Sequence, residues 1–262
     1  MNFERELEVC LNLVSSLRDD ILKIYNSDDF GTEIKEDNSP VTKVDKLVDK
    51  KIREVLSQEF PNFSFLTEES VDDLSRLKND FVFIVDPIDG TKDFLLKNGE
   101  FTVNIGISYK HKAVMGVIYV PATDETYFAL EGKGSFYKKT SDSKPVQIHT
   151  SDRETNLRVL TSRCHFNEFE QSTIDKYKDR FESINAVGAS LKGCLIAKGD
   201  ADYHIRQSSN TKEWDTCAMQ VVVEQAGGHL LRFDGKPIVY NREDVYNRDG
   251  YIICNRIENY LL

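Results

Sequence analysis

Hydrophobic residues in the first quarter of the chain recur at helical spacing. Between residues 3 and 24, and again between residues 44 and 59, apolar side chains follow one another mostly three or four positions apart. This spacing brings side chains to one face of an α-helix. The pattern predicts one amphipathic helix over residues 3–24 and a second over 44–59, with turn chemistry between them at Asn38-Ser39-Pro40.

Shorter apolar runs follow, and their length is typical of β-strands. They lie at residues 63–66, 81–86, 101–109 and 113–120. The last two flank Lys110-His111-Lys112, which predicts a hairpin, and Gly132 and Gly134 indicate a further turn among short strands. The first half is therefore expected to be α+β with antiparallel strands.

The second half alternates strand and helix patterns. Strands are expected at residues 157–162, 183–187, 201–206, 229–233 and 251–254, and helices begin near Asn167, Ala189 and Trp214. Such alternation predicts a layered α/β arrangement. A polar stretch with a proline precedes it, so we place a boundary there, with an N-terminal part over residues 1–140 and a C-terminal part over 141–262.

Composition narrows the class of protein. The 262 residues are 40% hydrophobic and 30% charged, which is typical of a globular chain. A net charge of −10 without a basic cluster argues against binding a nucleic acid polymer. No apolar run reaches the ~18 residues of a membrane helix, and the N-terminus lacks the pattern of a signal peptide. Five scattered cysteines indicate reduced thiols and a cytoplasmic protein.

Four acidic residues stand where a strand ends or a helix begins: Glu68, Asp86, Asp89 and Asp215. Carboxylates that converge on one crevice repel one another unless a hard cation joins them, and Mg²⁺ suits oxygen ligands. Pro87 fixes the backbone between two of these acids, so the Ile88 carbonyl could face the same point. Gly90 permits a tight turn, and residues 91–93 could open a helix that faces an anion.

Simpler interpretations exist for the same residues. An Asp-Pro or Asp-Gly pair is usually a turn or a helix cap. Thr42 and Asp45 fit a capping box, so Asp45 could merely begin the second helix. The joint pattern of the acids favours a metal site over these readings.

Five motifs in this order resemble the inositol monophosphatase superfamily of lithium-sensitive, Mg²⁺-dependent phosphatases. They are DNSPVTKVD, FLTEES, VDPIDGTKDF, NGEFTVNIGI, and EWDT followed by EQAGG. The resemblance spans most of the chain and implies that family's αβαβα sandwich. Within the superfamily, DGTKDF, SRCH and GASLKG are similar to the branch of bacterial 3′(2′),5′-bisphosphate nucleotidases. Two departures are Ala189, where the branch usually has serine, and one extra residue in RQSSNTKEWD.

The resemblance implies a site residue by residue. One Mg²⁺ is expected on Glu68, Asp86 and the Ile88 carbonyl, and a second shares Asp86 and adds Asp89 and Asp215, with two or three ions in all. The Thr91 hydroxyl, polarised by Asp45, would orient or deprotonate the attacking water.

The resemblance also implies the residues that bind substrate: Gly90, Thr91, His165, Lys192 and Arg206. The last three would hold a second phosphate beyond the reach of the metals. His165 could instead be an ordinary surface imidazole, and Lys192 a solvated helix residue. Trp214, the only tryptophan, is expected to pack in the core rather than stack on a base.

The reaction implied is hydrolysis of the 3′-phosphate of 3′-phosphoadenosine 5′-phosphate to AMP and phosphate, in a protein that is a monomer or a homodimer. An inositol or sugar phosphatase of the same fold is the main alternative. A non-catalytic nucleotide-binding regulator is disfavoured because the ligands and the Thr91–Asp45 pair are all present. A phosphatase of short oligonucleotides would need a basic track that the chain lacks.

Overall fold

The computed structural model describes residues 2–27, 29–34, 40–208 and 210–262. In this part of the chain the elements are α1 (Glu4–Ser16), α2 (Arg18–Tyr25), β1 (Glu33–Ile34), β2 (Pro40–Val41), α3 (Lys43–Glu59), β3 (Ser64–Thr67), η1 (Ser75–Lys78), β4 (Phe81–Asp89), α4 (Thr91–Leu95), β5 (Thr102–Tyr109), β6 (Lys112–Val120), β7 (Glu125–Leu130), β8 (Gly134–Lys138), β9 (Val146–Ile148), β10 (Leu157–Ser162), α5 (Glu168–Lys176), η2 (Lys178–Arg180), β11 (Phe181–Val187), α6 (Leu191–Ala197), β12 (Tyr203–Arg206), α7 (Glu213–Gln225), β13 (His229–Arg232), β14 (Tyr251–Cys254) and η3 (Ile257–Asn259).

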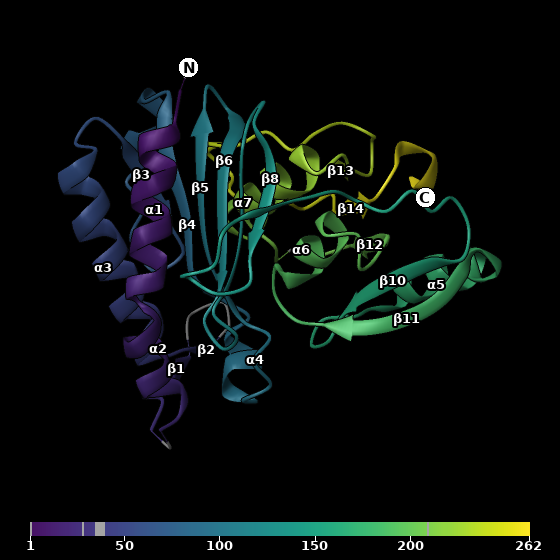
Figure 1. Cartoon of the computed structure of the whole chain (residues 1–262), viewed down its shortest axis with the longest axis horizontal. Coiled ribbons are helices and arrows are strands. Elements are labelled where there is room, and N and C mark those ends of the chain that lie inside the picture. Colours follow the sequence, from purple (N-terminus) through teal and green to yellow (C-terminus); the bar gives the residue numbers. More distant parts are fainter. Residues whose placement is uncertain (1, 28, 35–39, 209) are drawn as a thin grey trace.

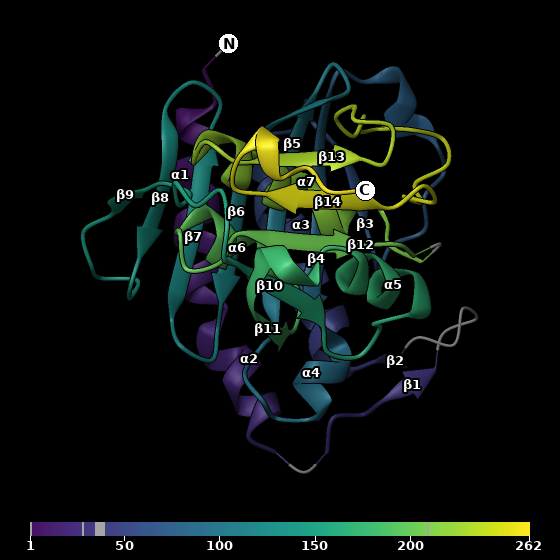
Figure 2. The ribbon, with the colours of Figure 1, turned by 90° about the vertical axis from the view of Figure 1, so that its right-hand side faces the viewer.

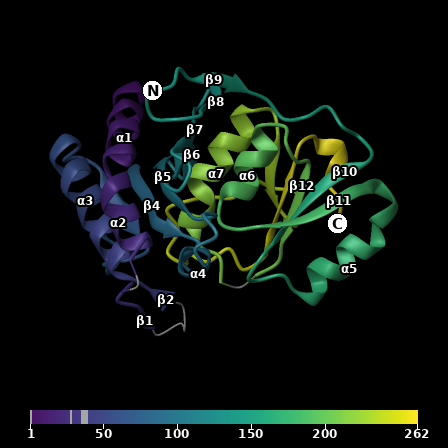
Figure 3. The same cartoon turned by 60° about the horizontal axis from the view of Figure 1, so that its bottom comes forward.

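The elements form five layers of alternating helices and sheets, and the first four follow one another from left to right in Figure 1. Helices α1, α2 and α3 cover one face of a mostly antiparallel sheet of order β3-β4-β5-β6-β7-β8-β9. Helices α6 and α7 lie between this sheet and a second one, of order β11-β10-β12-β14-β13. The second sheet faces the viewer in Figure 2, and α5 covers its outer side in Figure 3. This is the αβαβα sandwich expected from the sequence.

The first predicted helix is in fact two helices. α1 ends at Ser16 and α2 begins at Arg18. The hydroxyl of Ser16 donates to the Leu13 carbonyl (2.7 Å), and the Leu17 amide donates to Val14, three residues back (3.3 Å). Serine side chains compete for backbone acceptors in this way and disturb a helix. The apolar spacing missed the break because Leu17 stays buried on the shared face.

The predicted second helix and the hairpin are confirmed. α3 begins at Lys43, where Thr42 and Asp45 form the capping box. Strands β5 and β6 are joined at Lys110 and His111, which both have positive φ (50° and 66°). Two residues with positive φ match the twist of a two-residue hairpin turn.

Helix α7 fits closely against the large sheet because two glycines face it. A Cβ at Gly116 would lie 2.3 Å from the Ala218 carbonyl oxygen, and one at Gly106 would lie 2.6 Å from Cys217 Sγ. The two glycines pair across β5 and β6. The backbone of α7 therefore packs directly against the sheet, without side chains between them. This contact determines the position of the first turn of α7.

The two sheets share a hydrophobic core. The cluster around α7 includes Val82 and Ile118 of the large sheet together with Leu230 and Ile253 of the second sheet. The large sheet ends with β9, and residues 149–156 lead to β10. The division into residues 1–140 and 141–262 stays a prediction.

Candidate active site

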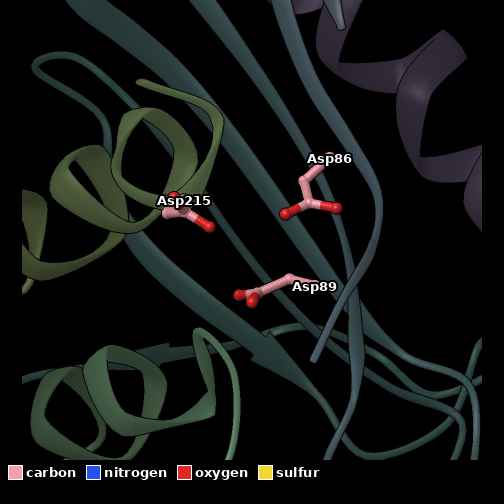
Figure 4. Close-up of side chains that lie close together, drawn as sticks. All are labelled: Asp86, Asp89 and Asp215. Carbon is pink, nitrogen blue, oxygen red and sulfur yellow. The ribbon is translucent and has the colours of Figure 1, made fainter. Parts of the chain in front are cut away.

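A β-bulge in β4 turns two carboxylates toward the same side of the sheet. Asp86 pairs with Asn104 of β5, and Asp89 pairs with Thr102, so three steps on β4 face two steps on β5. Side chains three positions apart in a regular strand point to opposite faces. The extra residue at Pro87–Ile88 removes this opposition. Both acids therefore point into one crevice, as Figure 4 shows.

Asp215 reaches the same point from the first turn of α7. One oxygen each from Asp86, Asp89 and Asp215 lies within 4.8 Å of the others. The Asp215 side chain also accepts the Lys212 backbone amide, and this contact orients the carboxylate at the helix start. Glu68 lines the same cleft, and its charge acts on Asp86. The structure thus brings together the four acids predicted from strand ends and helix starts.

Burial and mutual repulsion make this group of acids costly in the charged state. Burial, followed by the charges of Glu68, Asp89 and Asp215, raises the pKa of Asp86 well above its usual range. Burial, and then the Asp89 charge, raises the pKa of Asp215 to about 8. Carboxylate oxygens held this close together repel one another when charged, and they are the donor set that a hard divalent metal fits.

Two residues that the sequence analysis missed orient Asp89. The Ser190 amide and the Ser190 hydroxyl each donate to Asp89 Oδ2 (2.6 Å both), and Asn104 Nδ2 donates to the same oxygen (3.2 Å). All three donors therefore act on Oδ2. No local sequence pattern marks Ser190 or Asn104, because each reaches Asp89 from another segment of the chain.

Gly90 makes the turn after β4. Its φ is +87°, and a Cβ placed on it would lie 3.1 Å from the Ala189 side chain. A residue with a side chain would be strained there, and it would also press on the segment that carries Ser190. The short helix α4 begins directly afterwards, at Thr91.

The Thr91 hydroxyl lies between two acceptors. Its oxygen is 3.3 Å from Asp45 Oδ1 and 3.3 Å from the Ile88 carbonyl oxygen. Asp45 Oδ2 accepts the Thr42 amide (2.8 Å) and the Thr42 hydroxyl (2.6 Å). Asp45 therefore both caps α3 and reaches Thr91 with its other oxygen, so the two readings of this residue are compatible.

These groups line a cleft of ≈ 430 Å³ that cations also line. We call the four acids its acidic wall and Lys92, Lys192 and Arg206 its cationic wall. The acids, Ile88, Gly90 and Thr91 line the cleft, and so do Lys92, His165, Lys192 and Arg206. Asp45 lies behind Thr91. Every residue predicted for the site is therefore at the cleft or touches a residue that is.

The Lys192 ammonium is held in place beneath the cleft. The residue is 7% exposed, and its Nζ donates to the carbonyls of Ala189 (2.7 Å) and Val187 (3.3 Å). Burial lowers the pKa of Lys192, and the Asp89 charge opposes this effect. The reading of Lys192 as a solvated helix residue is therefore wrong.

His165 contacts Lys92 across the cleft. Lys92 Nζ lies 3.0 Å from His165 Nε2, so the ammonium donates a hydrogen bond to the unprotonated nitrogen of a neutral imidazole. Although His165 is exposed as a residue, loss of solvent around its ring, followed by the charges of Lys92 and Arg206, lowers its pKa to about 4. Its charge is therefore absent near neutral pH, and the cations of this wall are lysine and arginine.

Trp214 both packs and faces the cleft. Its residue is 8% exposed, in accord with the expected core position, yet it also lines the cleft. The Lys212 ammonium lies 5.3 Å from the ring centroids of Trp214 and of Tyr246. The tryptophan is therefore close enough to report on binding.

Comparison with known proteins identifies the family. A model of the inositol monophosphatase family matches residues 6–261. The chain belongs to that family. Among its relatives, a 3′(2′),5′-bisphosphate nucleotidase CysQ of Buchnera aphidicola subsp. Acyrthosiphon pisum (strain APS) is 35% identical over 91% of this chain and 89% of its own. The enzyme of the same name from Escherichia coli (strain K12) is 32% identical over 93% and 97%.

A solved structure agrees with this assignment. The crystal structure of CysQ from Bacteroides thetaiotaomicron matches with a TM-score of 0.85 and 33% identity, over 97% of this chain and 98% of that one. The expected family, fold and class of phosphatase are confirmed. In the described part of the chain, no helix has the length and apolar character needed to cross a bilayer.

Proposed function

We propose that this protein is a Mg²⁺-dependent phosphatase that removes the 3′-phosphate of 3′-phosphoadenosine 5′-phosphate, giving AMP and phosphate. The observation that carries the proposal is a single cleft lined both by converging carboxylates and by the cations Lys92, Lys192 and Arg206. Relatives that are 32–35% identical over most of the chain are named 3′(2′),5′-bisphosphate nucleotidases. A substrate with two phosphates would place one phosphate on the metals held by the carboxylates and the other on the cations.

The carboxylates would hold the metal. In the proposal Glu68, Asp86 and the Ile88 carbonyl bind one Mg²⁺, and Asp86, Asp89 and Asp215 bind another, with two or three ions in all. Bound there, the metal supplies positive charge to the phosphate oxygens and lowers the pKa of water. The donors are hard oxygens whose mutual repulsion a divalent cation relieves.

Thr91 and Asp45 would position the attacking water. When the Thr91 hydroxyl donates to Asp45 Oδ1, the Thr91 oxygen is left as an acceptor for a water proton. Asp45 is held by its capping bonds to Thr42, so the carboxylate stays fixed while it accepts. At the start of α4, Gly90 and Thr91 would bind oxygens of the reacting phosphate through the backbone.

The cationic wall would hold the second phosphate. Lys192 and Arg206 are both at least nine-tenths buried, so an anion that meets them loses little binding energy to solvent screening. Arg206→Ala should lower kcat/KM for the bisphosphate by about ten- to a hundredfold, the value of a charge-assisted hydrogen bond. A substrate without the 5′-phosphate, 3′-AMP, should be nearly unaffected. An equal loss on both substrates would remove this role from Arg206.

A panel of substrates tests the activity itself. Phosphate release from 3′-phosphoadenosine 5′-phosphate, inositol 1-phosphate and fructose 1,6-bisphosphate is measured in MgCl₂ and in EDTA. The proposal expects the highest kcat/KM for the nucleotide and no release in EDTA. Preference for either of the other two compounds would make the protein an inositol or sugar phosphatase instead.

Three further features complete the proposal. Lithium, competing for a Mg²⁺ position, should inhibit the reaction. All five cysteines are free thiols, which supports a reducing compartment, the cytoplasm. The protein would act as a monomer or a homodimer.

A further inference from the structure

A buried glutamate of α5 contacts the arginine of the cationic wall. Glu170 is 0% exposed and lies in the first turn of α5. Its Oε1 accepts Arg206 Nη1 (3.1 Å) and the Gln207 amide (2.9 Å). Arg206 Nη1 also donates to the His165 carbonyl oxygen. Both protons of Nη1 are thereby engaged.

The start of α5 is joined to the end of β12 by a second contact. Asn167 Oδ1 accepts the Glu170 amide (3.0 Å) as the helix cap, and Asn167 Nδ2 donates to the Gln207 carbonyl (2.6 Å). A reciprocal pair of side-chain contacts leaves the two segments little freedom to separate. These contacts fix the position of the Glu170 carboxylate, and the carboxylate in turn fixes the position of the Arg206 guanidinium.

These contacts determine which part of the guanidinium faces an anion. Within the described residues, the side-chain hydrogen bonds of Arg206 all come from Nη1. Arg206 lines the cleft with a side chain that is 9% exposed. The N–H groups of Nε and Nη2 are then the ones presented to a ligand.

We propose that Glu170 is a positioning residue that holds the Arg206 guanidinium in one orientation and partly neutralises its charge, and so sets the affinity of the cleft for the second anionic group of the substrate. The inference rests on the proposed function of this cleft. The carboxylate acts in two opposite ways: the fixed orientation strengthens anion binding, and the negative charge weakens it.

Two substitutions separate these effects. Glu170→Gln keeps an oxygen for Arg206 and Gln207 but removes the charge. The new amide nitrogen takes the place of Oε2, which is buried without a hydrogen-bond partner among the described residues, so no bond there is broken. Glu170→Ala removes both the oxygen and the charge. Glu168→Gln is the matched control, because Glu168 is an exposed acid in the same helical turn.

Binding of AMP, which carries only the 5′-phosphate, is measured by the fluorescence of Trp214, with adenosine as the reference ligand. Glu170→Gln should bind AMP about threefold more tightly, the size of a modest charge effect. Glu170→Ala should bind it about tenfold more weakly, as expected when the held donor is lost. Glu168→Gln should match the wild type, and adenosine binding should not change in any variant.

Kinetics give a readout that a merely structural role would not move. KM for the bisphosphate should fall in Glu170→Gln and rise in Glu170→Ala, with kcat unchanged in both. The kinetic constants for 3′-AMP should not change. Weaker AMP binding in Glu170→Gln, or equal changes on 3′-AMP, would overturn the inference. If the wild type released no phosphate from the bisphosphate, the proposed function would fail. Quenching of Trp214 fluorescence by inorganic phosphate, measured in EDTA on the wild type and the Glu170 variants, would still test whether Glu170 controls Arg206.

Discussion

At the scale of single residues, the site depends on how each carboxylate is aimed. Asp86 and Asp89 share a face only because the strand has a bulge between them, and Asp89 is then fixed through one oxygen by Ser190 and Asn104. That leaves Asp89 Oδ1 for a metal. The same acids on a regular strand would point to opposite faces and could not share an ion.

Asp89→Asn should lower kcat by orders of magnitude. The substitution keeps the shape of the side chain and removes the charge that a divalent cation needs. Mg²⁺ affinity, measured by calorimetry, should fall in parallel, while the melting temperature without metal should not fall, because a repelling charge has been removed. Full turnover by this variant would exclude Asp89 as a ligand.

Ser190→Ala should weaken Mg²⁺ binding by about tenfold. The hydroxyl is a charge-assisted donor to Asp89 Oδ2, and such a bond contributes about 1.5–3 kcal/mol. Calorimetric titration with MgCl₂ gives the affinity. Ser162→Ala, a serine that lines the same cleft, is the control and should leave it unchanged. Equal affinity in wild type and Ser190→Ala would show that the serine does not orient the ligand.

Motif order allowed the acids, Thr91 and Asp45 to be predicted from the sequence, because their chemistry is carried by residue identity. Ser190 and Glu170 were missed for a physical reason. Each acts through a contact between segments far apart in the chain, Ser190 on Asp89 and Glu170 on Arg206. No local pattern encodes such a contact. The bulge at Pro87–Ile88 was equally hidden, since the prediction ended the strand at Asp86.

At the scale of elements, the packing of α7 on the large sheet determines the position of Asp215. The sheet approaches the helix backbone at Gly116 and Gly106, and the first turn of α7 carries the acid. Periodicity predicted the helix but not this close approach, which depends on the pairing of β5 with β6. The break at Leu17 likewise escaped the pattern, because apolar spacing continues across it.

Gly116→Ala should destabilise the protein by about 1–3 kcal/mol, as overpacking does. A methyl group there would meet backbone, which cannot turn aside, and α7 would shift with Asp215. Chemical denaturation gives the stability, and calorimetry should show weaker Mg²⁺ binding. Gly132→Ala is the control: no atom lies within 4 Å of its Cβ position, so it should cost only the strain of its positive φ and leave Mg²⁺ affinity unchanged. Unaltered Mg²⁺ affinity in Gly116→Ala would show that the packing of α7 on the large sheet does not control the metal site.

At the scale of the whole molecule, protonation of the buried acids makes both the stability of the fold and the affinity for metal depend on pH. The folded-state pKa of Asp215 is raised to about 8 from an ordinary value near 3.8, and that of Asp86 is also raised. The metal-free folded protein therefore binds more protons than the unfolded chain, and its stability falls as pH rises from about 4 through about 8. Mg²⁺ requires the deprotonated carboxylates, so its binding releases protons and strengthens over the same range.

The increase in melting temperature caused by saturating MgCl₂ should thus be larger at pH 8 than at pH 6. Calorimetric titrations in two buffers of different ionisation enthalpy should show proton release at pH 6–7. Asp215→Asn should reduce both effects. An equal thermal shift at the two pH values, with no proton release, would contradict the proposed link between these acids and the metal.

The central claim is that the two walls of one cleft direct hydrolysis to the 3′-phosphate of a nucleoside bisphosphate. ³¹P NMR of 3′-phosphoadenosine 5′-phosphate incubated with the enzyme follows each phosphorus separately. In MgCl₂ the 3′ signal should disappear while inorganic phosphate and 5′-AMP form together, and in EDTA both signals should persist. Loss of the 5′ signal, or a nucleotide left intact in MgCl₂ by enzyme that consumes inositol 1-phosphate, would contradict it.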